Sequence, residues 1–405
     1  MKFSLFAAIV LYLTTPVFLQ GKFNIEHSIN KFSINLLADV NKEGGGNVNI
    51  ALSPLTIWTL LTIASEGAQE TTADQIDRVL QQPPNKSVVR KAYNNLISQF
   101  KVKSKEAEFE TSNGIFSRKE FPVRQIYSDI VKEFYNTNVV PVDFKNDNQG
   151  ATNIINKYVA KTTRNRITNL INTGDVQNAY LFMTSTAYFK GVWQIPFNRS
   201  ATRRSPFFDE NKNQVGEVQL MYQVYPFPYL RHNNIRADIV ELPYGFDDTF
   251  SMLLLVPRGD QTVINMLNSL NGESITDILE RLESNSKKFP DDNIHVHLPK
   301  FKVTSDFNLD VVLQAMGITD IFDPRRANLL GMFKQYLYLS RFIQKAEIEV
   351  DELGTIATAA AGAIFENRTP PPIVKANRPF VFFIVHKLSR SVIFAGKISN
   401  PNDLG

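Results

Sequence analysis

The side chains that most often perform catalysis are few in this chain, and their spacing matches no common catalytic site. The 405 residues include five histidines and no cysteine, which excludes thiol catalysis, disulfide bonds, zinc–cysteine sites and iron–sulfur clusters. His295 and His297 are two residues apart, so both point to one face of an extended strand, and no third metal ligand stands with them. We therefore expect two exposed polar strand positions here rather than a metal site.

The sequence motifs of the common enzyme classes are also missing. There is no phosphate-binding glycine loop, HExxH zinc motif, GxSxG nucleophile turn or glycine-rich dinucleotide turn. The acidic residues are scattered without the spacing of a carboxylate pair. A hydrolase assembled from residues distant in sequence is one hypothesis, but no pattern favours it. We predict that the chain is not an enzyme and needs no cofactor.

One segment near the C-terminus has a composition that suits recognition by a protease. From Gly354 to Ala363 every residue is Gly, Ala or Thr apart from Ile356, and three prolines follow at 370–372. Such small side chains cannot anchor a segment in a core, and the prolines stiffen the chain after it. Arg368 is the only basic residue between Leu353 and Val374. A flexible loop with one arginine is bait for a trypsin-like protease, whose specificity pocket holds an aspartate. A surface helix and a small-residue packing surface are the two simpler interpretations.

The elements around this segment predict an α+β fold. Apolar residues at helical spacing indicate a first helix ending at Gly44–Gly46, and Ser53-Pro54 is typical of an N-cap that starts a second, apolar helix reaching about Ser65. Further helices are predicted near 72–81, 87–101, 124–136, 150–161, 260–283 and 305–316, and strands at 250–256, 294–298, 380–385 and 392–396. Helices therefore dominate the first half and strands the second, which favours α+β over a parallel α/β fold.

The charge balance and the N-terminus bear on partners and location. The chain has 44 Lys+Arg and 40 Asp+Glu, a balance that does not predict nucleic-acid binding. An apolar run at 3–13 follows Lys2 and is too short to span a bilayer, which is typical of a secretory signal, although a buried N-terminal helix is the alternative. We predict a signal peptide at 1–21, a single domain at 22–405, and a secreted, extracellular monomer without membrane attachment.

Short segments in a fixed order over nearly the whole chain resemble the serpins. Any one of them is weak, but the ordered set is specific. The segments are Asn49–Leu55, Gly67-Ala68, Gln75-Ile76, Asn113–Phe116, Tyr188–Trp193, Leu242–Tyr244, Ser251-Met252, Leu298–Phe301, Gly317-Ile318, Arg378–Phe382 and Phe394–Lys397. The resemblance implies three β-sheets, about nine helices and an exposed reactive-centre loop at about 352–375. It also implies inhibition of a trypsin-like serine protease by suicide cleavage, followed by loop insertion into the main sheet.

The resemblance assigns roles to residues of the loop. It places the reactive bond between Arg368 and Thr369, and the hinge at Glu352, Gly354, Thr355, Ala357, Ala359 and Ala361. In an inserted strand alternate residues face inward, and here that inward face, from Thr355 to Ala363, has only small side chains. This pattern favours insertion without overpacking.

Some positions depart from the family pattern. Leu353 and Ile356 replace acidic residues that are usual in the hinge, which supports a second hypothesis of a non-inhibitory binding or carrier protein.

Two more departures lie at the shutter, the family's name for the point where the main sheet opens, which includes Ser53. There the family usually has asparagine at the position of Ser185 and histidine at that of Gln344. We predict that Ser185 and Gln344 still hydrogen-bond each other, although two independent neutral changes would explain them equally well.

Two surface modifications and one further partner are also predicted. Asn85 and Asn198 begin glycosylation sequons, and so does Asn367, where the following Pro370 disfavours modification. A glycosaminoglycan site is one hypothesis for the basic residues around 86–105, and a solvated helix face is the simpler one. These basic residues are Lys86, Arg90, Lys91, Lys101, Lys103 and Lys105.

Overall fold

The computed structural model describes residues 23–100, 106–353 and 370–405. The predicted signal peptide and the loop residues from Gly354 to Thr369, with the predicted reactive bond, lie outside the described residues. Within the described part the chain forms helices α1 (Ile25–Glu43), α2 (Pro54–Gly67), α3 (Glu70–Val79), α4 (Lys86–Gln99), α5 (Gln125–Tyr135), α6 (Asn148–Thr162), α7 (Val263–Leu270), α8 (Ile275–Lys288) and α9 (Asp310–Ala315).

The strands form three sheets. A five-stranded sheet has the order β11 (Phe301–Asn308), β12 (Leu339–Val350), β4 (Leu181–Gly191), β2 (Ala107–Arg118) and β3 (Val139–Val142). A six-stranded sheet has the order β1 (Ile50–Leu52), β15 (Ser391–Ile398), β14 (Phe380–His386), β9 (Phe250–Pro257), β8 (Ala237–Tyr244) and β7 (Tyr229–His232). A four-stranded sheet has the order β13 (Ile373–Lys375), β10 (Ile294–Pro299), β6 (Gln214–Tyr225) and β5 (Arg203–Phe208).

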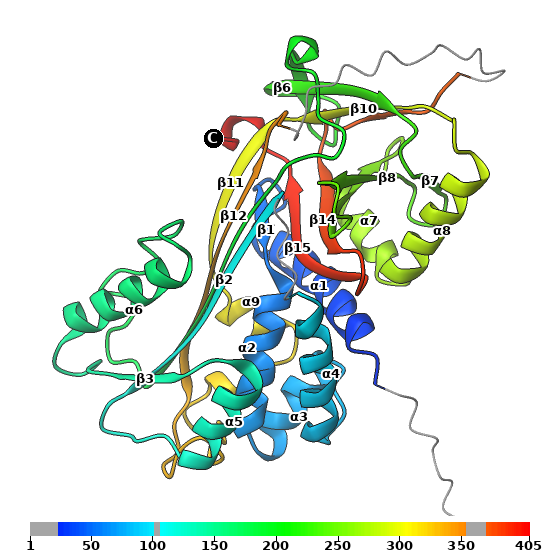
Figure 1. Cartoon of the computed structure of the whole chain (residues 1–405). Coiled ribbons are helices and arrows are strands. Elements are labelled where there is room, and N and C mark those ends of the chain that lie inside the picture. Colours follow the sequence, from blue (N-terminus) through cyan, green and yellow to red (C-terminus); the bar gives the residue numbers. More distant parts are fainter. Residues whose placement is uncertain (1–22, 101–105, 354–369) are drawn as a thin grey trace, which may run out of the picture.

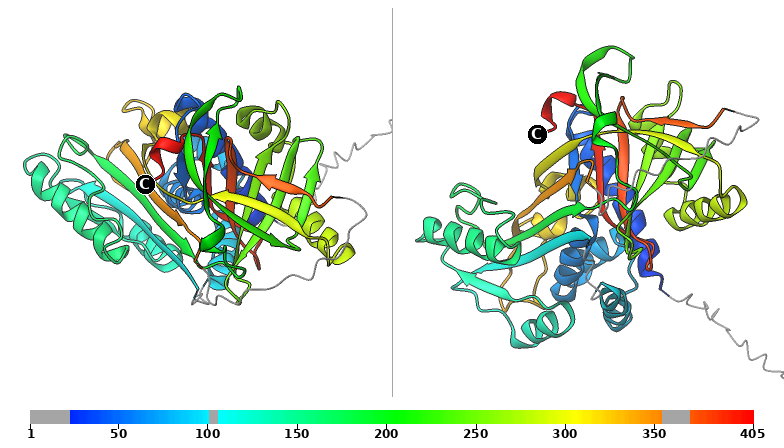
Figure 2. Two further views of the ribbon diagram at one scale, coloured as in Figure 1. Left: turned by 90° about the horizontal axis from the view of Figure 1, so that it is seen from above. Right: turned by 45° about the horizontal axis from the view of Figure 1, so that its top comes forward.

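The sheets and helices pack in layers. Figure 1 shows the five-stranded sheet along one side, with α6 on its outer face and α2 behind its inner face. The four-stranded sheet lies across the top, and both views of Figure 2 show β13 running outward beside β10 at the edge of the molecule. Every residue of α2 except Glu66 is buried, because this helix lies between the two larger sheets. The three-sheet α+β fold predicted from the sequence is confirmed.

Two of the predicted helices have different bounds in the structure. The range 260–283 is two helices, because Asn271 and Gly272 end α7 and the hydroxyl of Ser274 caps α8 by accepting from the Asp277 amide. The helix predicted at 305–316 is wrong over its first residues. There β11 alternates buried and exposed side chains, and helical spacing begins only at Leu309.

The prediction that helices dominate the first half is only partly right. Three strands of the five-stranded sheet, β2, β3 and β4, come from that half of the chain. In β4 all residues but Lys190 are buried, so the strand lacks the polar–apolar alternation that would have marked it. Among the described residues, no helix is long and apolar enough to cross a membrane.

Candidate functional site at the two ends of a parallel strand pair

The loop of unusual composition leaves the five-stranded sheet from the end of its central strand pair. β12 and β4 are parallel neighbours, in continuous register from Arg341 opposite Phe182 to Glu349 opposite Lys190. β12 ends at Val350, and the chain continues through Glu352 and Leu353 into the loop. Polar side chains join β12 to β4 or to elements packed on them at two levels, at mid-strand and at the end nearest the loop.

The mid-strand level is a neutral hydrogen-bond cluster around Gln344, which we call the gate. The amide Nε2 of Gln344 lies 3.2 Å from Ser185 Oγ on β4, 3.2 Å from Thr56 Oγ1 and 3.1 Å from the carbonyl oxygen of Ser53. Its Oε1 accepts from the backbone N–H of Ser53 at 3.2 Å. Two amide hydrogens serve three acceptors, so the donation is shared. The predicted bond between Ser185 and Gln344 is confirmed.

The gate also fixes α2 to the sheets on both of its sides. Ser185 Oγ donates to Thr56 Oγ1 at 2.6 Å, and Thr56 Oγ1 donates to the Ser53 carbonyl at 2.9 Å. Ser53 stands at the N-cap position, but its hydroxyl makes no cap bond and donates instead to the Ile393 carbonyl of β15 at 2.8 Å. The predicted N-cap position of Ser53 is therefore confirmed, but its hydroxyl bonds to the neighbouring strand, which offers a buried acceptor. Gln344, Ser185 and Ser53 are fully buried.

The level nearest the loop, which we call the clamp, begins with an aromatic contact. Trp193 stacks on Tyr244 with ring centroids 4.3 Å apart and is 2% exposed. Its indole Nε1 donates to the Asp351 carbonyl at 2.7 Å, and its backbone N–H donates to the Leu353 carbonyl at 3.0 Å. One tryptophan therefore holds the last described residues before the loop.

The clamp also contains two charged contacts. The Glu352 carboxylate accepts from Lys300 Nζ at 3.1 Å and from Thr202 Oγ1 at 3.0 Å. Lys190 Nζ lies 2.6 Å from Glu349 Oε1 across the β12–β4 pair. Burial by itself would raise the pKa of Glu352, but hydrogen bonds from its own amide, Lys300 and Thr202 hold that pKa below its ordinary value.

The chain rejoins the fold in the four-stranded sheet. The Pro372 carbonyl accepts from the His295 amide at 2.9 Å, and β13 pairs in parallel with β10, with Ile373 opposite His295. His295 and His297 do share one face, but they are half-buried and not exposed as predicted, because both pack on Tyr222. His295 Nδ1 lies 2.7 Å from the Tyr222 hydroxyl, and the described residues contain no cluster of three metal-ligating side chains.

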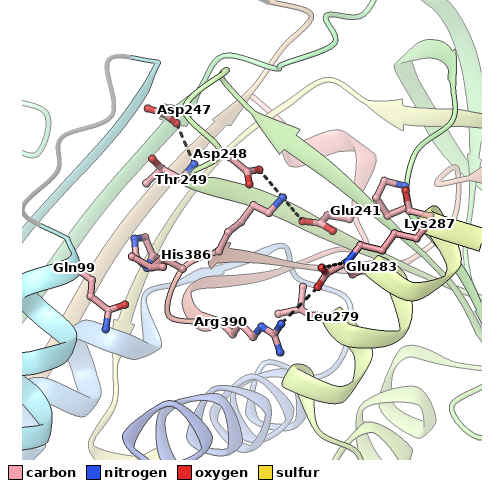
Figure 3. Close-up of a pocket in the computed structure, with 14 residues that line it drawn as sticks. Gln99, Glu241, Asp247, Asp248, Thr249, Leu279, Glu283, Lys287, His386 and Arg390 are labelled. Carbon is pink, nitrogen blue, oxygen red and sulfur yellow. Dashed lines mark hydrogen bonds and ion pairs between the residues drawn. The ribbon is translucent and has the colours of Figure 1, made fainter. Parts of the chain in front are cut away.

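A cavity of about 730 Å³ lies between α8, the ends of β8 and β14, and the turn after β14 (Figure 3). Its charged side chains pair with one another, as Lys387 does with Asp248 at 2.6 Å and Glu283 with Lys287 at 2.7 Å. His386 Nδ1 lies 2.8 Å from Ser389 Oγ, but both residues are less than 10% exposed, so a substrate cannot reach the hydroxyl. Burial lowers the pKa of His386 to about 4. This serine–histidine pair is a turn contact and does not support the hydrolase hypothesis.

The other predicted surface residues have definite places. Asn85 is exposed at the start of α4, and Asn198 is exposed at the start of a single helical turn at Arg199–Ala201. Each side chain accepts from the amide two residues on, and their glycosylation stays a prediction. In the basic cluster Lys86 pairs with Asp77 and Arg90 with Glu66, both at 2.6 Å. Lys91 is exposed, and residues 101–105 lie outside the described part. The described members therefore do not form a stripe of unpaired charge.

Several residues of the gate and clamp, among them Thr56, Trp193, Lys300 and Thr202, were not predicted from the sequence as site residues. Thr56 follows Ser53 by three residues, which places both on one helix face and could have identified it. Trp193 and Lys300 stand inside segments that carry the resemblance. Thr202 gave no signal, because its contact with Glu352 spans 150 positions of the sequence.

Comparisons with known proteins agree with this geometry. A family model described as "Serpin (serine protease inhibitor)" matches residues 27–401. The chain is similar to leukocyte elastase inhibitor of Xenopus tropicalis, at 31% identity over 382 residues covering 93% of this chain and 100% of that protein. It is similar to Serpin B3 of Homo sapiens, at 29% identity over 398 residues covering 93% and 100%. The crystal structure of Manduca sexta serpin-12 shares the fold, with a TM-score of 0.80, 24% identity and coverage of 93% and 98%. The chain therefore belongs to the serpin family, whose members are protease inhibitors and not enzymes.

Proposed function

We propose that this serpin inhibits trypsin-like serine proteases, with Arg368–Thr369 as its reactive bond. The single observation that carries the proposal is the parallel β12–β4 pair, from which the chain continues directly into the small-residue segment 354–363 that precedes Arg368. Arginine fits a specificity pocket that holds an aspartate.

The proposed reaction begins as ordinary proteolysis. The protease serine attacks the Arg368 carbonyl carbon, the peptide bond to Thr369 breaks, and the new amino group of Thr369 leaves as an ester forms on Arg368. Residues 354–368 then enter between β12 and β4 and carry the attached protease with them. Fully extended, these residues reach about 50 Å, against about 36 Å for the length of β4, so the segment can cover the whole strand.

The sheet geometry favours this insertion. A segment that folds back from the end of β12 runs antiparallel to both β12 and β4. One parallel ladder is then replaced by two antiparallel ones, which are somewhat more stable per residue. The gate bond from Gln344 to Ser185 and the Lys190–Glu349 pair must break first, so they hold the uncleaved form in a kinetic trap.

The N-terminal sequence supports secretion as part of the same proposal. A single lysine before a short apolar run is typical of a signal peptide, with cleavage after Gly21. Expression of the full chain in a secretory cell line, followed by N-terminal sequencing of the medium, tests this. We expect a mature chain that begins at Lys22, and retention of an intact Met1 in the cytosol would contradict secretion.

Incubation with trypsin tests the proposed inhibition. We expect a complex with trypsin that survives denaturing electrophoresis. Arg368→Ala should abolish it, whereas Lys375→Ala, which removes a nearby exposed cation, should not. Thr355→Arg should turn the inhibitor into a substrate, because a buried unpaired charge opposes insertion. Cleavage after Arg368 without any complex would contradict inhibition and favour the alternative of a binding or carrier protein.

A further inference from the structure

The far end of the β12–β4 pair, where both strands begin, is joined by a side chain instead of a regular backbone ladder. β12 takes two steps from Leu339 to Arg341 while β4 takes one from Leu181 to Phe182, so Ser340 is the extra residue of a β-bulge. The hydroxyl Oγ of Ser340 accepts from the Tyr180 amide at 2.9 Å. Rotation of this one side chain can therefore release the amide without moving either backbone.

The start of β4 is fixed to β2 on its outer side. The Arg118 amide donates to the Tyr180 carbonyl at 2.9 Å, and Arg118 Nε donates to the Ala179 carbonyl at 3.0 Å. The guanidinium carbon of Arg118 also lies 4.0 Å from the centroid of the Tyr180 ring. Arg118 is 8% exposed, so water competes little for these contacts. Tyr180 therefore belongs to the half of the sheet that contains β2 and β4.

The start of β12 is fixed to the other half of the sheet, which contains β11. Asp310, the first residue of α9 after β11, accepts from the Phe342 amide at 2.7 Å and from Arg341 Nη1 at 3.1 Å. The two halves meet here through the bond from Tyr180 to Ser340 and through the rings of Tyr180 and Tyr338, whose centroids lie 5.3 Å apart. Opening the sheet at this end must part these contacts, whereas the contacts of Arg118 and Asp310 stay within their halves.

We propose that Ser340 is a positioning residue for the last stage of loop insertion. In the uncleaved chain its hydroxyl accepts from the Tyr180 amide. When the incoming segment reaches the strand start, the hydroxyl rotates away and a backbone carbonyl of the segment accepts from that amide instead. The inference rests on the proposed function. Tyr180 precedes Lys190 by ten residues, which is about 33 Å in an extended strand and lies within the reach of the segment.

This role makes the effect of the hydroxyl depend on the state of the chain. Without it the Tyr180 amide loses its partner in the uncleaved form, but in the inserted form the incoming strand supplies one. Ser340→Thr and Ser340→Val form a matched pair that differs by the hydroxyl. A cavity of about 450 Å³ beside Ser340 leaves room for the added methyl groups.

Hydrogen exchange at the Tyr180 amide tests the proposed exchange of partners, by mass spectrometry of a peptide that contains it. Before cleavage we expect three- to tenfold faster exchange in Ser340→Val than in Ser340→Thr, and after thermolysin cuts within 354–368 we expect equal, slow exchange. Ser274→Ala is the control, because the Ser274 hydroxyl accepts from the Asp277 amide on α8. That amide should exchange faster both before and after the cut. Fast exchange at Tyr180 in cleaved Ser340→Val would overturn the proposal.

The time course of insertion gives a second measurement. Because the chain has no cysteine, a fluorophore on Asn178→Cys reports on the far end, and one on Phe246→Cys reports on the end near the loop, where Gly245 donates to the Val192 carbonyl. After mixing with trypsin, the signal at 178 should follow that at 246 after a lag. Ser340→Val should shorten this lag about three- to tenfold, and Ser340→Thr should keep it.

The outcomes separate this inference from the proposed function. A lag that is unchanged in Ser340→Val, or shortened equally in Ser340→Thr, would overturn the role of Ser340 while trypsin is still trapped. Absence of any covalent complex with the parent chain would instead overturn the proposed function, and the exchange comparison on the thermolysin-cut chain would still decide the role of Ser340.

Discussion

The gate and the clamp join the same central strand pair to its surroundings by different chemistry. The gate is fully buried and neutral, made of an amide, hydroxyls and backbone groups around Gln344. The clamp is partly exposed and combines the Trp193 ring with charged pairs such as Lys300–Glu352. The β12–β4 pair is therefore held together by two sets of contacts. The gate contacts should not respond to pH or salt, whereas the charged contacts of the clamp should respond to both.

The largest expected effect comes from breaking the gate. Gln344→Ala leaves the backbone N–H of Ser53 without its partner and opens a buried cavity, so we expect the free energy of unfolding to fall by about 2–4 kcal/mol. Denaturant unfolding monitored by tryptophan fluorescence measures it. Gln125→Ala, at an exposed helix position, is the matched control. A loss below about 0.5 kcal/mol would show that the gate bonds do not hold the sheet.

The contribution of Trp193 to the clamp can be measured by comparing its substitution with that of Trp58, the only other tryptophan in the chain. Trp193→Phe removes the bond to the Asp351 carbonyl, and Trp58→Phe removes a similar bond to Ser28 Oγ at 2.9 Å, far from the loop. Each substitution should lower the free energy of unfolding by about 1–2 kcal/mol. Only Trp193→Phe should change the number of inhibitor molecules consumed per protease. An equal change in that number with Trp58→Phe would contradict a specific clamp.

The charged part of the clamp should contribute less. A double-mutant cycle of Lys300→Ala and Glu352→Ala should give a coupling free energy of about 0.2–1 kcal/mol, since Lys300 is 49% exposed. The coupling should shrink at 1 M salt. The same cycle on the more exposed helix pair Glu283 and Lys287 serves as a reference of about 0.3–0.5 kcal/mol. Coupling that is unchanged by salt would mean that the pair acts as a neutral hydrogen bond.

The smallest expected effect is the pH response. Because contacts in the folded state hold the pKa of Glu352 below its unfolded value of 4.5, its contribution to stability is present above pH 4.5. It should be lost as the pH falls through the lower folded-state pKa. Glu352→Gln should therefore lessen the acid destabilisation seen in thermal melts between pH 6 and pH 3. Gln344→Ala should leave the shape of that profile unchanged, because the gate has no titrating group, and an altered shape would contradict the comparison.

The sequence predicted the local and ordered features of the site better than its long-range contacts. Ser185 and Gln344 were placed together by a resemblance that covers nearly the whole chain, and the structure pairs them. Thr202 was not predicted, because it meets Glu352, a residue distant in sequence, only after folding. The last four residues of β11, 305–308, fall in the range predicted as a helix, because the helical spacing that follows them masks their period-two burial.

The central claim is that the folded chain is kinetically trapped above a form with its loop inserted between β12 and β4. The most direct measurement is the thermal midpoint before and after the loop is cut within 354–368 by thermolysin, a metalloprotease that forms no acyl-enzyme. Our account predicts a rise of more than about 20 °C after cleavage. An unchanged or lower midpoint would contradict it.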